Sequence, residues 1–425
     1  MFPKITVLIP SFNRERFLKE CLDSVLAQTV PAHQIIFVND GSTDGTAKVL
    51  APYRDKVEYF ETLQLGKPSA INFGLKYVTG DYLWIFDDDD VALPDALERF
   101  VQPLEDHPEY GFSYSTFFFS STDEATGKIG RVLSESSIPD VDRRGFLPPL
   151  LEGNFLGGAA LFARTVCYEQ VGNFDPKLLR SQDYEMAIRI ALKYKGIRVK
   201  GGSTFHYRQH GGQRGCLQDR FDIQYRNDKC LEYDRMFFLC LYGSLPLSAY
   251  LPPAYSLDKH LRQALLQRIR VLMSKLLFAE VIKDFQELSR VRYMGKLSEL
   301  EREIVRGTFY NLRLYYKTSN MRDYPDFFRM LNKHSGLSMN MLLIRMEFAR
   351  KTLGHMFFNR QWAFILKDLS ILFDLCLYSG WLDKRKFWIS KKRNKNTQDK
   401  REHLSGREGN IGATKGTALR WSDNG

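Results

Sequence analysis

Short apolar runs alternate with longer amphipathic stretches through the first half of the chain. Residues 5–9, 34–38 and 82–86 are apolar runs rich in β-branched and aromatic side chains, which predicts buried strands. Between the first two, apolar side chains recur at helical spacing from Phe17 to Leu26, which predicts a helix. Strands that alternate with helices at this spacing are typical of a mostly parallel sheet in an α/β domain.

A polar, turn-rich segment follows each of these strands. Residues 10–13, 39–46 and 87–90 contain the Pro, Asn, Asp, Ser, Thr and Gly residues that favour turns and helix caps. Open α/β sheets bind ligands at the carboxyl ends of their parallel strands. The three segments are therefore expected to meet at one edge of the sheet.

Residues 87–90 are four consecutive aspartates directly after the third predicted strand. Adjacent carboxylates raise one another's pKa unless a cation lies among them. Their hard oxygen ligands suit Mg²⁺ or Mn²⁺, ions that often accompany a phosphate. The alternative is a solvated acidic turn, because acidic runs are common on protein surfaces.

Two further aspartates allow both a functional and a structural interpretation. Asp40 follows the second predicted strand and can accept hydrogen bonds from a base or a ribose, although a lone Asp in a turn more often forms an Asx-turn or a cap. Asp183 begins an amphipathic stretch. The pattern by itself favours an N-cap or an acidic residue of the first helical turn, which the helix dipole stabilises, and a carboxylate there could also take up a proton.

Six segments occur in an order that resembles glycosyltransferase family 2. They are VLIPSFNRERFLKECLDSVLAQT, VNDGSTDGT, GKPSAINFGL, GDYLWIFDDDD, GGAALFARTVCYEQVGNFD and SQDYEMAIRIA. The resemblance covers about residues 4–215, roughly half of the chain. It implies a GT-A fold, in which a nucleotide-binding half and an acceptor-binding half share one sheet, and an inverting transfer from a nucleotide sugar.

The resemblance also implies roles for individual residues. Asp40 matches the carboxylate that receives the N–H of the base. Asp89 matches the metal ligand, and Asp183 matches the base that takes the proton of the acceptor hydroxyl. The other residues that it places around the donor are Pro10, Phe12, Asn13, Lys67, Asp87 and Asp88, while Asp90 receives no assigned role.

Residues 205–214 resemble the loop that closes over the diphosphate in this family. Arg208 is the expected phosphate contact, because its planar guanidinium suits phosphate oxygens. His210 is a candidate metal or phosphate ligand, with a surface hydrogen-bonding role as the alternative. The chain departs from the family pattern at Asn39, Gln182 and Gln213, which leaves the nucleotide less certain; a UDP-sugar is the expected donor.

The second half of the chain has a helical pattern between about residues 257 and 382. Similar triplets with a central Asp at 283–285, 325–327 and 367–369 are 42 residues apart, near the period of helix-pair repeats. Such an array would serve docking or oligomerisation. The alternative is an ordinary helical bundle packed on the catalytic domain.

Three regions are expected: a GT-A catalytic domain at 1–230, an all-α domain at 231–388 and a basic tail at 389–425 without stable structure. The apolar stretches 236–255 and 362–382 contain prolines or charges and do not predict membrane spans.

The formal net charge of +11 calls for an acidic partner. Lysines and arginines mixed with tryptophan between residues 381 and 395 suit an anionic membrane surface, with a solvated tail as the alternative. No nucleic-acid fold is recognised, so nucleic acid is not expected. Six scattered cysteines fit a reducing compartment, and the first strand begins too early for a signal peptide. A cytoplasmic protein, peripheral at the inner face of the membrane, is expected.

The expected activity is metal-dependent sugar transfer to a glycan or lipid-linked acceptor in surface polysaccharide assembly. Acceptor choice is expected to depend on the irregular stretch 120–149 and the loop 153–158. A catalytically silent GT-A domain, with the helical half as the functional part, is the alternative. A glycoside hydrolase with two carboxylates is disfavoured, because it needs neither the aspartate cluster nor nucleotide-binding strand ends.

Overall fold

The fold consists of one mixed sheet flanked and followed by helices. A computed structural model of the 425-residue chain describes residues 3–211, 219, 225–292 and 295–318, which all belong to one compact unit. The strands in these residues are β1 (Ile5–Ser11), β2 (Gln34–Asn39), β3 (Glu58–Glu61), β4 (Tyr82–Ile85), β5 (Val91–Ala92), β6 (Phe112–Thr122), β7 (Ile129–Glu135), β8 (Leu161–Arg164) and β9 (Gly196–Gln209).

The first half of the sheet is parallel and fully covered. β1 pairs in parallel with β2 on one side and with β4 on the other, and β2 pairs in parallel with β3. Every residue of β1, β2 and β4 is buried, as expected of strands with both faces covered. The three strands predicted from the apolar runs are confirmed.

The second half of the sheet is mixed. β8 runs antiparallel to both β4 and β6, β9 runs parallel to β6, and β5 and β7 are antiparallel additions to β9 and β6. The complete order is β3-β2-β1-β4-β8-β6-β9-β5, with β7 beside β6. The predicted α/β class is confirmed, while the mostly parallel arrangement holds for the first half only.

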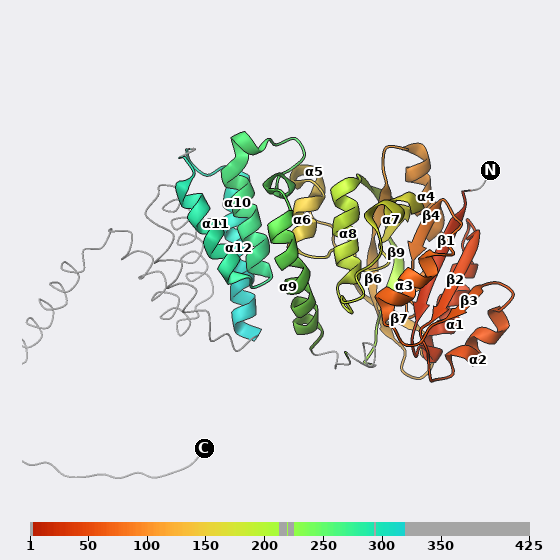
Figure 1. The fold of residues 1–425 in the computed structure, drawn as a ribbon. Helices are drawn as coiled ribbons and strands as arrows, with labels where there is room; N and C mark the ends of the chain where they lie inside the picture. The colour runs from red at the N-terminus through yellow and green to blue at the C-terminus, as the bar shows by residue number, and fades with distance from the viewer. Residues whose placement is uncertain (1–2, 212–218, 220–224, 293–294, 319–425) are drawn as a thin grey trace, which may run out of the picture. The chain divides into compact units, whose positions relative to one another are not determined.

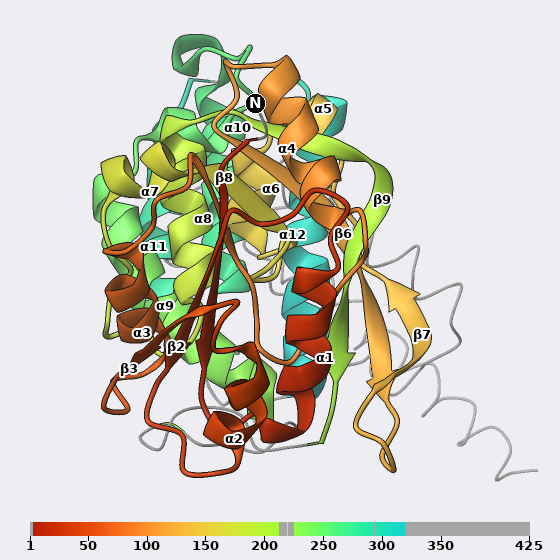
Figure 2. The same cartoon turned by 90° about the vertical axis from the view of Figure 1, so that its right-hand side faces the viewer.

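Helices lie on both sides of the parallel strands, as Figure 2 shows for α1 and α3. The apolar stripe predicted for α1 is buried at Phe17, Leu18, Cys21, Leu22 and Val25. The helices that accompany the sheet are α1 (Glu15–Leu26), α2 (Thr46–Leu50), α3 (Lys67–Leu75), α4 (Ala96–Asp106), α5 (Val141–Arg144), α6 (Leu147–Glu152), α7 (Thr165–Val171) and α8 (Gln182–Lys193).

The stretch 120–149, expected to be irregular, contains regular structure. It holds the end of β6, all of β7, α5 and the start of α6. Most residues of β7 are exposed, so the strand has no alternating apolar pattern to reveal it. The strand forms because it pairs with β6, whose residues lie outside the segment 129–135.

Four longer helices follow the sheet in the described part of the chain (Figure 1). They are α9 (Arg226–Ser244), α10 (Leu257–Ser274), α11 (Phe278–Arg290) and α12 (Glu299–Thr318). α10 packs against α11, α12 and the short α6. Glu152, the last residue of α6, accepts a hydrogen bond from Gln267 and forms an ion pair with Arg270 at 2.9 Å, so α10 is tied to the segment that leads into loop 153–158.

Among the described helices, none combines the length and the apolar character that a membrane crossing requires. Of the predicted repeat triplets, 283–285 lies in α11. The triplets at 325–327 and 367–369, the apolar stretch 362–382 and the tail 389–425 lie outside the described residues.

Candidate functional site

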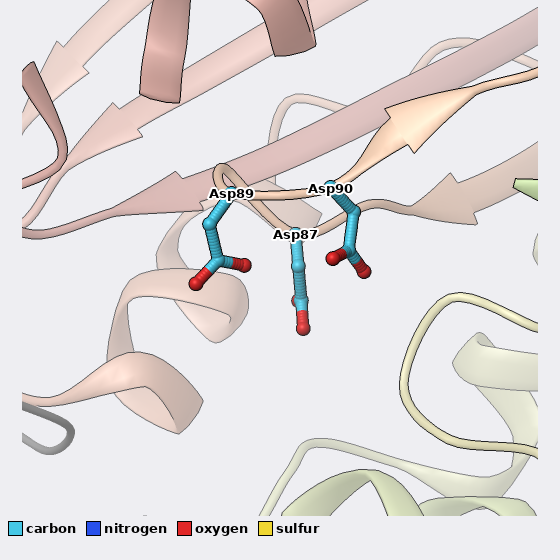
Figure 3. A group of neighbouring side chains, drawn as sticks. All are labelled: Asp87, Asp89 and Asp90. Carbon is cyan, nitrogen blue, oxygen red and sulfur yellow. The ribbon is translucent and has the colours of Figure 1, made fainter. Parts of the chain in front are cut away.

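The acidic turn, residues 87–90, begins directly after β4, at the edge where the neighbouring β1 also ends. Oxygen atoms of Asp87, Asp89 and Asp90 lie within 4.8 Å of one another. Figure 3 shows the three carboxylates pointing to the same side of the turn. The sequence prediction that this run emerges at the ligand-binding edge of the sheet agrees with this placement.

Three of the four residues of the acidic turn, Asp88, Asp89 and Asp90, are buried. Burial raises the pKa of Asp88 to about 7, with Arg14 opposing this change and Asp89 adding to it. Burial also raises the pKa of Asp90, and the neighbouring Asp89 and Asp87 raise it further. The Oδ2 atom of Asp90 is buried without a hydrogen-bond donor among the described residues.

A divalent cation fits these residues. Asp87, Asp89 and Asp90 would hold it through hard carboxylate oxygens, the ligands that Mg²⁺ and Mn²⁺ prefer. Its charge would offset the repulsion within the turn and satisfy the orphan oxygen of Asp90. No role was assigned to Asp90 from the sequence, and it is the folded turn that brings its carboxylate oxygen to within 4.8 Å of those of Asp87 and Asp89.

Cationic and imidazole side chains from distant segments reach the same turn. Lys67, the first residue of α3, places its Nζ 2.5 Å from Asp87 Oδ1. Arg14 places its Nε 3.4 Å from Asp89 Oδ2. His210, just beyond β9, places its Nε2 3.2 Å from the same oxygen. The structure therefore brings Asp89 and His210 together, and their metal-binding role stays a prediction.

A cavity of about 840 Å³, part of it open to solvent, lies beside the acidic turn. The predicted donor-binding residues that line it are Pro10, Phe12, Asp40, Lys67, Asp87, Asp88 and Asp89.

Asp40 holds the loop that borders this cavity. Its Oδ1 accepts hydrogen bonds from Thr62 Oγ1 at 2.7 Å and Leu65 N at 2.8 Å, and its Oδ2 accepts one from Gly66 N at 2.8 Å. Gly66 has φ +85°, in the region that favours glycine. Asp40 is thus a structural anchor that also lines the cavity, so both interpretations of it from the sequence remain open.

Asn13 joins two strand ends and does not line the cavity. It adopts φ 53°, a left-handed conformation that Asn tolerates. Its backbone N–H donates to Ser42 Oγ at 2.9 Å, and its Oδ1 accepts from Thr43 N at 2.8 Å. The structure therefore gives Asn13 a scaffolding contact between the loops after β1 and β2.

Arg208 lies in a strand, although the sequence led us to expect a loop over residues 205–214. Residues 205–209 belong to β9, and the guanidinium of Arg208 is fully buried. It donates to the Asp89 carbonyl oxygen at 2.5 Å, to the Gly127 carbonyl oxygen at 2.7 Å and to Glu20 Oε2 at 2.6 Å. The guanidinium is therefore occupied by protein partners that brace the acidic turn, and its expected phosphate contact stays a prediction.

Asp183 and Asp87 of the acidic turn both lie next to Gly158. Asp183 lies in the first turn of α8 and accepts a hydrogen bond from Asn154 Nδ2 at 3.2 Å. A Cβ built on Gly158 would lie 3.5 Å from Asp87 Oδ2 and 3.6 Å from Asp183 Oδ2. A second, smaller hollow is lined by Lys67, Asp87, Gly158 and Asp183, so it shares Lys67 and Asp87 with the larger cavity.

Burial raises the pKa of Asp183, while Lys67 lowers it and Asp87 raises it. The burial effect is the largest of the three, because an ionised carboxylate loses its hydration there. A carboxyl group with a raised pKa is a stronger proton acceptor than an ordinary surface aspartate once it is ionised.

Sequence reasoning missed several residues of the larger cavity. Ser11, Arg14, Arg180 and Tyr207 line it, and none was assigned a role beforehand. The sequence position of Arg14 could have indicated its place, because it directly follows the segment 10–13 that was expected at the nucleoside.

The chain is similar in sequence to known glycosyltransferases. Residues 6–170 match the family described as Glycosyl transferase family 2. An "Uncharacterized glycosyltransferase" of Rickettsia felis is 31% identical over 217 residues, which are 49% of this chain and 35% of that protein. The "Poly(ribitol-phosphate) beta-glucosyltransferase" of Bacillus spizizenii is 29% identical over 218 residues, covering 48% of this chain and 32% of that protein. The chain thus spans about a third of the length of these relatives.

Among solved structures, S. aureus TarS has a TM-score of 0.46 and 15% identity, covering 76% of this chain and 54% of that one. The mannosyltransferase PcManGT of Pyrobaculum calidifontis has a TM-score of 0.41 and 15% identity, covering 90% of this chain and 88% of that one. The assignment to a family therefore depends on the sequence match. Residues 6–170 are therefore similar to glycosyl transferase family 2.

Proposed function

We propose that this protein is a metal-dependent inverting glycosyltransferase that moves a sugar from a UDP-sugar to a hydroxyl of a glycan or lipid-linked acceptor. The observation that carries the proposal is that the carboxylates of Asp87 and Asp183 both lie next to Gly158. Asp87 belongs to a cluster of carboxylates that suits a cation, and the separate carboxylate of Asp183 suits a base.

The donor would occupy the larger cavity. Pro10, Phe12 and Asp40 supply an apolar wall and an acceptor for the nucleoside, and Lys67 supplies a fixed positive charge next to the acidic turn. A nucleotide sugar requires both kinds of surface, because its base is flat and largely apolar while its diphosphate is charged. Arg208 is left out of the donor contacts, because its side chain is buried among protein partners.

A bound Mg²⁺ or Mn²⁺ would act as a Lewis acid that stabilises the negative charge of the departing diphosphate. Asp87, Asp89 and Asp90 are the residues that would hold it, with His210 beside Asp89. Lys67 would contribute a further cation, since its Nζ lies 2.5 Å from Asp87 and stays charged there.

Asp183 would carry out the acid–base step. The acceptor oxygen forms a bond to the anomeric carbon while the bond from that carbon to the diphosphate oxygen breaks. The acceptor proton passes to a carboxylate oxygen of Asp183, and the bonding electrons leave with the diphosphate. Asn154 holds that carboxylate through its hydrogen bond at 3.2 Å. Attack on the face opposite the leaving group inverts the anomeric configuration.

The acceptor would be a polymer or lipid-linked intermediate of the cell surface. A relative named as a poly(ribitol-phosphate) glucosyltransferase supports a surface polymer. The loop 153–158 lies between α6 and the residues around Asp183, where an acceptor hydroxyl has to approach. We further propose the division 1–230, 231–388 and 389–425, with peripheral membrane contact by the basic residues near the end and oligomerisation through the helical domain.

A thermal-shift panel tests the donor site. UDP, GDP, dTDP and CMP are each added with and without Mn²⁺, because a ligand that binds only the folded state raises the unfolding midpoint. We expect a rise with UDP that requires Mn²⁺. The absence of any shift with all four nucleotides would contradict the proposal and favour a silent domain whose helical half is functional.

A release assay then separates an enzyme from a binding protein. The full chain is incubated with a UDP-sugar, Mn²⁺ and candidate acceptor glycans, and free UDP is measured. We expect UDP release that Asp183→Asn removes while UDP still binds. Matched binding by both proteins with no release by either would favour the silent alternative.

A further inference from the structure

Arg14 lines the larger cavity, whereas Arg208, the arginine that the sequence suggested, is not among the described residues that line it. The Nε of Arg14 is 3.6 Å from Asp88 Oδ1 and 3.4 Å from Asp89 Oδ2. The side chain is 20% exposed and lines the larger cavity. A positive charge that is accessible from the cavity therefore faces two carboxylates of the acidic turn.

The backbone at Arg14 and Glu15 is held by residues 44–46, in the segment that follows β2. Asn13, at φ 53°, turns the chain between β1 and α1. The backbone N–H of Arg14 donates to Thr46 Oγ1 at 3.1 Å, and that of Glu15 donates to Asp44 Oδ2 at 3.1 Å. The root of the side chain is therefore fixed, and any movement of the guanidinium has to occur about the side-chain torsions.

The guanidinium groups of Arg14 and Arg208 are held in different ways. Arg208 donates from all three of its nitrogen atoms at 2.5 to 2.7 Å. Within the described part of the chain, the Nε of Arg14 approaches carboxylate oxygens only at ion-pair distances of 3.4 and 3.6 Å, and its Nη1 donates to the Asn13 carbonyl oxygen at 3.2 Å. Arg14 is therefore held to the turn by charge attraction over longer distances, which a competing cation can overcome.

Arg14 and a divalent cation would compete for the same carboxylate. Asp89 pairs with Arg14 and also belongs to the group of acidic residues that could hold a metal ion. Two cations next to one carboxylate repel each other, so binding of the divalent ion weakens the hold on the guanidinium. A released arginine fork in this cavity matches the geometry of phosphate oxygens.

We propose that Arg14 is an exchangeable counter-ion: it neutralises Asp88 and Asp89 in the absence of metal, and the divalent cation frees it to bind the diphosphate of the donor. Arg14 is then a specificity-determining residue that couples metal binding to recognition of a nucleoside diphosphate. This inference rests on the proposed function, because it requires a diphosphate donor in the cavity.

The exchange makes two predictions of opposite sign. Loss of the Arg14 charge removes a competitor of the metal, so the protein binds Mn²⁺ alone more tightly. The same loss removes a phosphate contact, so UDP binds more weakly when Mn²⁺ is saturating. A residue that only supports the fold would weaken both ligands together.

Isothermal titration calorimetry of the full chain tests the exchange with Arg14→Gln. We expect Mn²⁺ alone to bind several-fold more tightly than to the wild type. UDP with saturating Mn²⁺ is expected to bind about tenfold more weakly, the scale of a charge-assisted hydrogen bond. UMP is expected to lose less affinity than UDP, because it lacks the second phosphate.

Arg16→Gln is the matched control. Arg16 lies two residues further along, is 44% exposed on its side chain and pairs with Glu124 away from the cavity. Its variant is expected to match the wild type with every ligand. Arg14→Lys keeps the charge but removes the fork, so it should retain wild-type Mn²⁺ affinity and still bind UDP more weakly.

Weaker Mn²⁺ binding by Arg14→Gln, or UDP affinity equal to that of Arg16→Gln, would overturn the inference. If Arg14→Gln does not fold, a wild-type UDP affinity in Arg14→Lys overturns it instead. A wild-type protein that binds Mn²⁺ but no nucleotide would contradict the proposed function. In that case tighter Mn²⁺ binding by Arg14→Gln would still support the counter-ion half of the inference.

Discussion

Asp87 of the acidic turn and the single carboxylate of Asp183 both line the smaller hollow but are held in different ways. The turn is surrounded by positive groups and donors from the loop after β1, from α3 and from β9, including Lys67 at 2.5 Å. Asp183 is held by Asn154, a neutral donor at 3.2 Å. The difference suits two tasks, since a charge-binding site needs fixed counter-charges whereas a base must be able to take up a proton.

The two regions also have different supports. The acidic turn is braced from within the sheet by Arg208 of β9. The start of α8 is braced by helices, because the Tyr184 hydroxyl donates to carbonyl oxygens of α6 at 2.7 and 3.0 Å, and Lys275 Nζ lies 4.8 Å from the centre of its ring. Lys275 follows α10, so the helical region directly supports the helix that carries the proposed base. This contact gives the helices a structural role in the site.

The sharpest test of the difference is Asp89→Asn. We expect it to abolish the Mn²⁺-dependent binding of UDP, because it removes a charge that the cation requires. Calorimetry with UDP and Mn²⁺ measures the loss. Asp55→Asn, at an exposed position after α2, is the control and should bind as the wild type does. Unchanged UDP binding by Asp89→Asn would show that the metal is held elsewhere.

Asp183→Asn should separate catalysis from binding. The amide can keep the contact with Asn154 but cannot take a proton, so turnover should fall by a factor on the order of 10² to 10⁴ while UDP binding stays near that of the wild type. Steady-state rates of UDP release together with calorimetry measure the two effects. A rate near the wild-type value would place the base at another residue.

Arg208→Met should disturb the acidic turn through the fold. Its removal leaves Glu20 and two backbone carbonyl oxygens without their donor, so the free energy of unfolding should fall by about 3–5 kcal/mol. Denaturant unfolding measures this change. Arg198→Met, at an exposed position of the same strand, should stay within about 0.5 kcal/mol of the wild type. Equal stabilities of the two variants would refute the bracing role.

The smallest expected effect concerns the pH dependence of turnover. Burial raises the pKa of Asp183, and the protonated form cannot act as a base, so the rate should rise with pH to a plateau through a midpoint above that of an ordinary aspartate. Asn154→Ala removes a donor that favours the charged form, and it should move the midpoint to higher pH with little change in the plateau rate. Turnover measured against pH at saturating donor tests this shift of the midpoint. An unchanged midpoint would show that Asn154 does not position the base.

Local sequence patterns predicted the first half of the sheet well. β1, β2 and β4 are short apolar runs between polar turns. The apolar run and the turn that ends it lie within a few residues of each other in the sequence. The gathering of Asp40 and the acidic turn followed from the parallel arrangement of these strands. In contrast, β7 was missed, because most of its side chains are exposed and its pairing with β6 has no signature within 129–135.

The sequence alone determined which chemical groups the protein has at its strand ends, because apolar runs end at fixed positions and four aspartates follow one of them. The tertiary structure alone decided which positively charged side chain faces these aspartates. Arg208 was expected in a loop, but its strand directs the guanidinium into the interior. Arg14 reaches the acidic turn because the ends of β1 and β4 lie side by side. The direction of a long side chain depends on partners tens of residues away, and the residues next to it in the chain do not encode them.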